Sequence, residues 1–168
     1  MRTLFLILCL ANIAVAMGMI WWMPDPMATR FGDGGQPVSV MSPDVFAVFI
    51  GGLVVLFVLL VLGMPRWMRM LPASLFNLPN RSFWMNEENR PRTERRIRSF
   101  LNAIGVAMML LFLLLQWLTF QANRTTPPQL NLPIFWCSFA GFLAAIATLT
   151  VQFYLSFRLP KTTDSEIQ

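Results

Sequence analysis

Four long apolar segments dominate this chain of 168 residues, and none of them contains a Lys, Arg, Asp or Glu residue. The segments cover approximately residues 4–22, 45–64, 100–120 and 134–157. A helix needs about 20 apolar residues to cross the hydrocarbon core of a bilayer, which is about 30 Å thick. The chain leaves no room for a separate soluble domain. We therefore expect an all-α fold, an integral membrane four-helix bundle that forms one domain over residues 1–168.

The basic residues predict which way this bundle crosses the membrane. Loops that face the cytoplasm carry most of the Arg and Lys residues near the spans. The linker over residues 65–99 contains eight Arg residues, whereas the loop over residues 23–44 contains Arg30 alone. Arg2 marks the N-terminus, and the C-terminal tail carries two more basic residues. We expect both termini and the Arg-rich linker in the cytoplasm, and the loop over residues 23–44 on the outer side.

Proline residues mark the expected ends of the spans. Pro43 and Pro133 suit the first turn of a helix, where a missing N–H breaks no hydrogen bond. Pro65 is expected to end the second span, because a further turn would need its N–H. The third helix is expected to begin near Pro91, before the membrane, so that its first Arg-rich turns lie in the cytoplasm.

Small residues predict where the helices pack, since lipid supplies no hydrophobic drive between helices and close backbone approach must help. The fourth segment places Cys137, Gly141 and Ala145 on one ridge, and the second contains Gly51-Gly52. We expect contacts within the bundle at these faces, with a homodimer face as the alternative. Polar residues inside the spans are expected to hydrogen-bond between helices or, alternatively, to line a substrate path. These residues are Asn12, Asn102, Gln116, Thr119, Thr148 and Gln152.

The outer loop is dense in Pro and Gly, and we expect it to be rich in turns rather than helical. It reads Met23-Pro24-Asp25, then Arg30-Phe31, then Gly35-Gln36-Pro37. This order resembles the motif Leu-Pro-Asp-x-x-x-x-His-Phe, followed by Gly-x-Pro, of a bacterial membrane domain family of unknown function. That family also forms the N-terminal part of SdpI-type immunity proteins. Arg30 stands where the family usually has His, so no pH-sensing or metal-binding role is carried over. The motif residues that we select as a candidate site are Pro24, Asp25, Arg30, Phe31, Gly35 and Pro37.

The inner linker resembles the same relatives through Asn77-Leu78-Pro79 and the later Phe83-Trp84. It mixes Arg with large apolar residues, a composition that suits a chain in the lipid headgroup zone. The net charge of +5 could also suit nucleic acid, but the expected topology favours anionic headgroups instead. A protein partner is the alternative, since the resemblance implies that such a linker could tether one. The expected lipid or partner contacts are Arg66, Arg69, Arg81, Trp84, Arg92, Arg95 and Arg96.

Several kinds of chemistry find no support in the residues. The chain has no His, so neither a Ser–His nor a Cys–His pair can exist. Cys9 and Cys137 lie within spans and are interpreted as packing residues rather than a disulfide. Met residues near the outer face could favour Cu(I), but adaptable packing is the preferred interpretation. The first segment contains Ala14-Val15-Ala16, which resembles the cleavage site of a signal peptide, yet its long apolar run suits a retained span. We expect no catalytic residues, no metal site and no cofactor.

Two functions remain after these exclusions. The first is a non-enzymatic, multi-pass protein of the bacterial inner membrane that senses, or gives immunity to, a membrane-active agent, as the resemblance implies. The second is an accessory subunit of a larger membrane complex, which fits the small size and the small-residue faces. A transporter or a lipid-handling enzyme ranks last, because the spans contain no charged residue.

Overall fold

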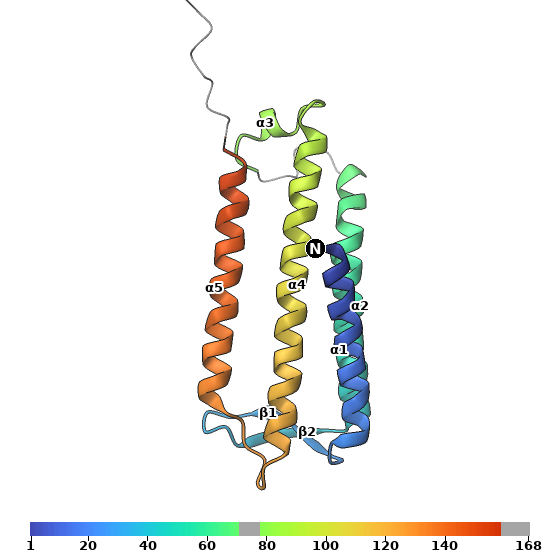
Figure 1. Cartoon of the computed structure of the whole chain (residues 1–168), viewed down its shortest axis with the longest axis vertical. Coiled ribbons are helices and arrows are strands. Elements are labelled where there is room, and N and C mark those ends of the chain that lie inside the picture. The colour runs from blue at the N-terminus through green and yellow to red at the C-terminus, as the bar shows by residue number, and fades with distance from the viewer. Residues whose placement is uncertain (71–77, 159–168) are drawn as a thin grey trace, which may run out of the picture.

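The computed structural model describes residues 1–70 and 78–158, with the backbone alone at Met68 and Arg69. Four helices are long and apolar enough to cross a membrane, as the sequence predicts. They are α1 (Arg2–Trp22), α2 (Pro43–Met70), α4 (Arg90–Asn123) and α5 (Leu132–Ser156), and a short α3 (Arg81–Trp84) precedes α4. The helices run up and down side by side, so that α1 begins and α5 ends toward the same end of the bundle (Figure 1). The chain is a multi-pass membrane protein.

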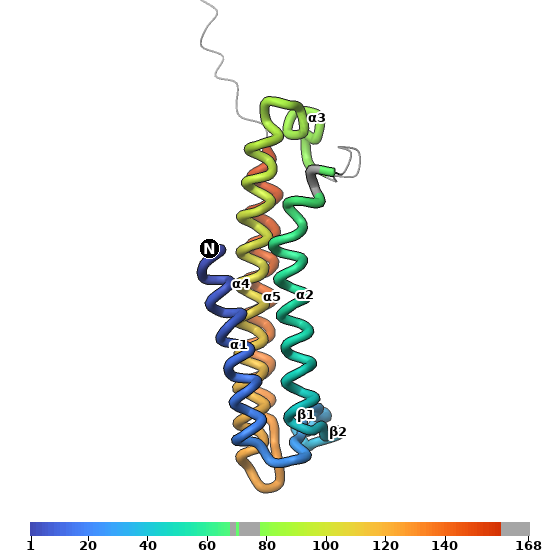
Figure 2. Tube along the Cα trace, turned by 90° about the vertical axis from the view of Figure 1, so that its right-hand side faces the viewer, coloured from blue at the N-terminus to red at the C-terminus, as the bar shows by residue number. Residues whose placement is uncertain are grey.

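The two ends of the bundle differ in structure. We call the end that carries the β-strands the hairpin end, and the end that carries α3 the arginine end (Figure 1). At 1.5 Å per residue, the 34 residues of α4 extend about 51 Å, which exceeds the hydrocarbon core. The first turns of α4 therefore stand beyond the start of α1 at the arginine end (Figure 2).

The three helix starts predicted at prolines are confirmed, and one predicted helix end is wrong. Pro43, Pro91 and Pro133 occupy the first turns of α2, α4 and α5. Pro65, however, lies inside α2, which continues to Met70. One missing N–H costs a membrane helix a single hydrogen bond, and neighbouring groups can satisfy the freed carbonyl. The lack of a donor at Pro65 is therefore not enough to end α2.

A two-stranded antiparallel hairpin occupies the loop over residues 23–44, where the sequence predicted turns. Its strands are β1 (Met27–Phe31) and β2 (Pro37–Met41), which pair Met27 with Met41 and Phe31 with Pro37. The residues at the turn, 32–36, include three Gly. β-Branched residues alternate in β2 at Val38 and Val40, a pattern that suits a strand. The Pro and Gly residues on either side hide this short pattern in the sequence.

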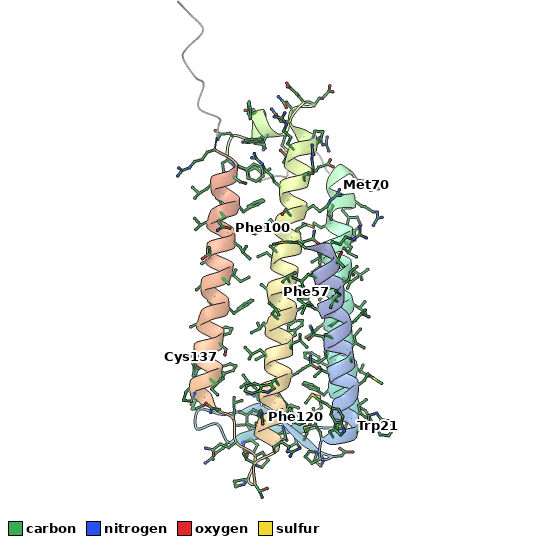
Figure 3. All side chains as sticks on the ribbon, in the orientation of Figure 1. Trp21, Phe57, Met70, Phe100, Phe120 and Cys137 are labelled. Atoms are coloured by element: carbon green, nitrogen blue, oxygen red, sulfur yellow. The ribbon has the colours of Figure 1, made fainter. Side chains whose placement is uncertain are left out.

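The core lies among α1, α2 and α4, where buried apolar residues of the three helices pack together. These residues are Phe5, Cys9, Ala16, Ile50, Val54, Val61, Met109 and Phe112. Phe57 of α2 meets Phe112 of α4 edge to face at 5.6 Å between ring centroids (Figure 3). The helices pack tightly at Gly105, where a Cβ would lie 2.9 Å from the Phe5 ring and 3.0 Å from Val61.

The small-residue faces of α2 and α5 do not make the predicted contacts. Cys137, Gly141 and Ala145 are all exposed, and no residue of α5 is buried. No described heavy atom lies within 4 Å of a Cβ built at Gly51, Gly52 or Gly141. The tight packing occurs at the single Gly105 instead. The physical reason is that α5 approaches α4 through large rings, such as the stacked Phe100 and Phe153 at 4.2 Å (Figure 3).

Polar residues join α1 to α4 within the spans. This agrees with the first of the two predictions for these residues, which was hydrogen bonding between helices. The Gln116 Nε2 donates to the Asn12 Oδ1 at 2.8 Å, and the Asn12 Nδ2 donates to the Met109 carbonyl at 3.0 Å. Both amide side chains are fully buried. In contrast, Asn102 and Thr148 donate to carbonyls of their own helices. Interhelical hydrogen bonding is thus confirmed for Asn12 and Gln116.

Candidate functional site

A cavity of about 580 Å³ lies beneath the hairpin, between α2, α4 and the first turn of α5. We call it the hairpin cavity. Most of its wall is apolar and rich in aromatic rings, which is typical of pockets that take small molecules. Its lining from α2 is Phe46, Phe49, Ile50 and Leu53, and its lining from α4 is Phe112, Leu115, Gln116, Leu118 and Thr119.

Helix periodicity builds the two long walls of the hairpin cavity. The α2 residues stand at positions 46, 49, 50 and 53, and four of the α4 residues stand at 112, 115, 116 and 119. Both sets follow the spacing i, i+3, i+4, i+7, which places them along one helix face. The cavity wall from α5 is fixed at its start, where the Asn131 side chain accepts a hydrogen bond from the Ile134 N–H at 3.1 Å. This cap places Phe135 and Trp136 at the cavity.

The hairpin forms the roof of the cavity through Thr29, Arg30, Phe31, Gly32 and Asp33. The strands run across the hairpin end of the bundle, near the end of α4 and the start of α5 (Figure 1). Two polar links hold the hairpin there.

The first link joins β1 to the end of α4. The Ala28 N–H donates to the Asn123 Oδ1 at 2.7 Å, and the Asn123 Nδ2 donates to the Ala28 carbonyl at 2.8 Å. The second link joins the hairpin turn to the segment before α5, where the Leu130 N–H donates to the Gly35 carbonyl at 2.8 Å. Arg30 and Phe31 are therefore held over the cavity from two sides.

Polar groups are few in the hairpin cavity, and they differ in kind. Arg30 and Asp33 lie in the roof, and Arg30 is exposed. Gln116 lies in the wall, and its Oε1 is buried without a hydrogen-bond partner among the described residues. A buried acceptor without a partner costs about 1–3 kcal/mol. A ligand that brings a donor to this oxygen would remove that cost.

The rim of the cavity faces the surface that lipid would cover. Phe49 of α2 is 56% exposed and Trp136 of α5 is 59% exposed, although both line the cavity. Exposed aromatic side chains of α2 and α5 therefore stand at the rim of the cavity. A hydrophobic or amphipathic molecule in contact with these two side chains would lie next to the cavity.

The predicted outer motif does not form one cluster. Arg30 and Phe31 line the hairpin cavity, whereas the exposed Pro24 and Asp25 lie between α1 and β1. Gly35 has a φ of +74°, and a Cβ there would lie 2.6 Å from the Leu130 carbonyl oxygen. Pro37 begins β2 opposite Phe31. The motif therefore divides into a pair that lines the cavity and residues that shape the loop.

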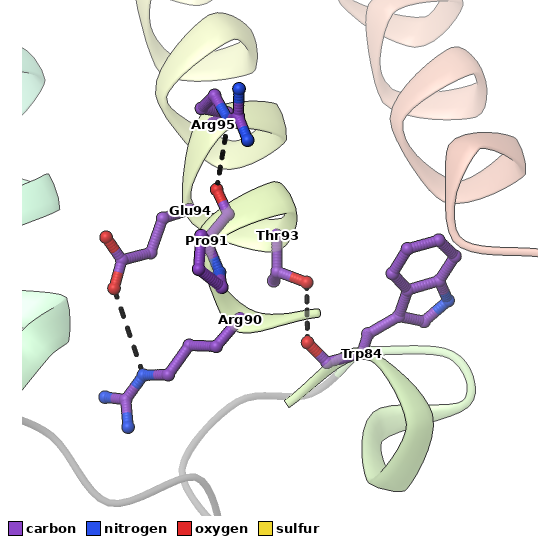
Figure 4. Close-up of polar contacts among 6 residues, drawn as sticks. All are labelled: Trp84, Arg90, Pro91, Thr93, Glu94 and Arg95. Atoms are coloured by element: carbon purple, nitrogen blue, oxygen red, sulfur yellow. Dashed lines mark hydrogen bonds and ion pairs between the residues drawn. The ribbon is translucent and has the colours of Figure 1, made fainter. Parts of the chain in front are cut away.

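The predicted inner residues also divide. Trp84 is buried at 4% exposure, where its Nε1 donates to the Phe157 carbonyl at 2.9 Å. The Arg96 guanidinium lies 4.2 Å from the centroid of the Trp84 ring and donates to the Ser156 carbonyl. Thr93 donates to the Trp84 carbonyl at 2.7 Å (Figure 4). Trp84 and Arg96 thus fasten the end of α5 to α4, and Trp84 is too buried to meet lipid headgroups.

The other predicted arginines lie at the surface of the arginine end. Arg66, Arg81, Arg92 and Arg95 are exposed, and the Arg95 Nε donates to the Pro91 carbonyl at 3.4 Å (Figure 4). The same close-up shows the Arg90–Glu94 ion pair at 3.9 Å. The side chain of Arg69 lies outside the described residues. This surface is the one that remains for lipid or partner contact.

Sequence reasoning missed the cavity, although one of its signals was available. Gln116 was selected as a polar residue of a span, but its place beside Phe112 and Leu115 on one helix face was not used. A second hollow of about 620 Å³ lies across Leu130, near the segment that joins α4 and α5, and has no charged residue in its lining. Among the described residues, no group of three or more Cys, Asp or Glu side chains could hold a metal ion.

Comparisons with protein-family models, with curated proteins and with solved structures find no match to this chain. The hairpin cavity therefore has to be interpreted from its own residues.

Proposed function

We propose that this protein is a non-enzymatic sensor or immunity protein of the bacterial inner membrane, of the SdpI-related kind, and that the hairpin cavity receives a membrane-active agent. One observation carries the proposal. Arg30 and Phe31, the central pair of the outer motif, lie in the roof of an aromatic cavity whose lining includes the exposed Phe49 and Trp136. An agent that disturbs membranes is amphipathic, so its apolar part would fill the cavity and its polar part would meet Arg30 and Asp33.

The proposed orientation places the hairpin on the outer side and the arginine end in the cytoplasm. It rests on the excess of Arg residues at one end of the spans. An agent that arrives from outside would then meet the hairpin first. The exposed Arg66, Arg81, Arg92 and Arg95 would lie against anionic headgroups of the inner leaflet, where each basic residue contributes about 1 kcal/mol.

The experiment compares protection in cells that express the wild type or a variant. The challenge is a panel of amphipathic membrane-active peptides and lipopeptides, and the readout is survival. Arg30→Ala and Phe31→Ala should lose protection, because they remove the polar and the aromatic part of the roof. Val40→Ala is the matched control, since Val40 is 56% exposed on the same hairpin and does not line the cavity.

Membrane-fraction levels of each variant show that insertion is intact. Unchanged survival in both roof variants would contradict the proposal, and so would an equal loss in Val40→Ala. If the wild type protects against no agent in the panel, the proposed sensor or immunity function is contradicted, and the alternative of an accessory subunit remains.

That second function, an accessory subunit of a membrane complex, is favoured by α5. Its small-residue ridge of Cys137, Gly141 and Ala145 is exposed, and such ridges suit close helix contact in lipid. Purification in mild detergent should then recover a partner chain, or a second copy, at a fixed ratio. Replacing Gly141 with Leu should abolish that recovery, and a lone monomer would contradict this function.

A further inference from the structure

Three arginines from three helices line a small pocket at the arginine end. Arg2 of α1, Arg66 of α2 and Arg98 of α4 surround a volume of about 210 Å³. We call it the arginine pocket, and its remaining lining is Val61, Leu62, Pro65 and Asn102. Each arginine stands next to the apolar part of its span, so the pocket lies at the depth where lipid headgroups meet the hydrocarbon.

The three helices that carry these arginines pack tightly next to the arginine pocket. Gly105 lies one turn after Asn102 in α4, and it lets the Phe5 ring and Val61 meet the α4 backbone. Phe5 is fully buried, and Val61 is 4% exposed. This three-helix contact brings together the helices that carry the three arginines, and all three arginines line one pocket.

The described residues place no negative charge in the lining of the pocket. Within the described residues, no ion pair involves Arg2, Arg66 or Arg98, and no carboxylate lines the pocket. Three guanidinium groups around one pocket repel each other, and an anion between them would relieve that repulsion. Arginine presents a planar set of N–H donors that matches phosphate oxygens. The pocket therefore suits a phosphate group.

Asn102 adds an independent requirement. It is 6% exposed, its Nδ2 donates to the Arg98 carbonyl at 2.7 Å, and its Oδ1 is buried without a partner. A hydroxyl or an ammonium group on a ligand would donate a hydrogen bond to this oxygen. The three guanidinium groups would repel an ammonium group, so a hydroxyl remains.

We propose that the arginine pocket binds a phosphate group that carries a nearby hydroxyl, and that its source is the headgroup of an anionic glycerophospholipid such as phosphatidylglycerol. The arginines would hold the phosphate, and the headgroup glycerol would donate to the Asn102 Oδ1. Val61 and Leu62 would contact the first carbons of the acyl chains. This lipid would join α1, α2 and α4 at the arginine end.

The test measures lipid binding to the purified full-length protein by native mass spectrometry. The probes are phosphatidylglycerol, phosphatidylmethanol and phosphatidylethanolamine with identical acyl chains. Phosphatidylmethanol has the same charge as phosphatidylglycerol but no hydroxyl. Wild type should bind phosphatidylglycerol most tightly. Arg66→Gln and Arg98→Gln should weaken that binding by about tenfold or more, as expected when a charged hydrogen bond is lost.

Two matched variants separate the pocket from general charge attraction. Arg158→Gln changes the same charge at an exposed position just after α5, outside the pocket and outside the predicted lipid contacts, and should leave binding unchanged. Asn102→Leu should remove the preference for phosphatidylglycerol over phosphatidylmethanol while both lipids still bind. This preference does not depend on how much protein folds, because both lipids are measured on the same sample.

A further arm adds inorganic phosphate at millimolar concentration. Phosphate could bind to the wild type and not to Arg66→Gln, with no preference among the lipids. The arginine pocket would then bind phosphate as proposed, but the ligand would be free phosphate rather than a lipid headgroup. Equal binding of the three lipids without phosphate binding would overturn the proposal. An equal loss of binding in Arg158→Gln and Arg66→Gln would overturn it as well.

Discussion

Asn123 of α4 holds Ala28 of β1 by two hydrogen bonds, at 2.7 and 2.8 Å, and so takes the place of a third strand beside the hairpin. Ala28 is 2% exposed, so its N–H and carbonyl depend on this side chain. The Asn123 Nδ2 also donates to the Thr119 carbonyl at 2.8 Å, which fixes the amide on the helix. One amide thus sets the position of the roof over the hairpin cavity.

Replacing Asn123 with Leu should release the hairpin from α4. Each backbone group of Ala28 that loses its partner costs about 1–3 kcal/mol. The hairpin should then detach locally while the spans stay folded. Limited proteolysis is the measurement: cleavage after Arg30 should speed up several-fold, while the helix content stays constant by circular dichroism. The exposed Gln121→Leu is the control, and equal cleavage of both variants would contradict this role for Asn123.

The second prediction concerns Gly35 at the hairpin turn. Its φ of +74° disfavours a side chain, and a Cβ would lie 2.6 Å from the Leu130 carbonyl oxygen. Gly35→Ala should therefore destabilise the hairpin end by more than the cost of about 1 kcal/mol for an unfavourable backbone conformation alone. The neighbouring Gly34→Ala is a close control, because no described atom lies within 4 Å of its Cβ position.

Thermal unfolding in detergent should show the lower midpoint for Gly35→Ala and little change for Gly34→Ala. Similar midpoints for the two variants would show that the close approach of Gly35 to Leu130 does not affect stability.

The third prediction concerns the hydrogen bond between Asn12 and Gln116. A double-mutant cycle with Asn12→Leu and Gln116→Leu should give a coupling free energy of about 0.6–1.7 kcal/mol, the range found for such bonds in membranes. Each single variant leaves a buried amide with one fewer partner, whereas the double variant removes both amides. Unfolding in mixed micelles gives the four free energies. Additive effects would show that the two side chains do not stabilise one another.

The sequence predicted the four spans because lipid places a strong demand on composition. An apolar run of sufficient length without charge can hardly do anything other than cross the membrane. The starts of α4 and α5 were predictable for a similarly local reason, since Pro91 and Pro133 lack an N–H that the first turn does not use. The end of α2 was not predictable in this way, because the free-energy cost of the hydrogen bond lost at Pro65 depends on its neighbours in space.

Contacts between distant residues were beyond local reasoning. Trp84 was predicted to contact lipid or a partner protein, yet the residue that accepts its hydrogen bond, Phe157, lies 73 positions away along the chain. The exposed ridge around Gly141 and the buried Gly105 look alike in the sequence. Only the packing of Phe5 and Val61 against α4 distinguishes them. The roof of the hairpin cavity was half predicted, since Arg30 and Phe31 were selected without the cavity that they cover.

The last prediction concerns orientation, on which the proposed function depends. In a background with Cys9→Ala and Cys137→Ala, a single Cys replaces either Ser39 of β2 or Glu87 at the arginine end. Both positions are exposed. A membrane-impermeant maleimide added to intact spheroplasts should label the Ser39→Cys variant and leave the Glu87→Cys variant unlabelled. Permeabilised membranes should label both, which controls for reactivity. Labelling of Glu87→Cys alone in intact cells would place the hairpin cavity at the cytoplasmic face, where an agent from outside would not meet Arg30 and Phe31 first.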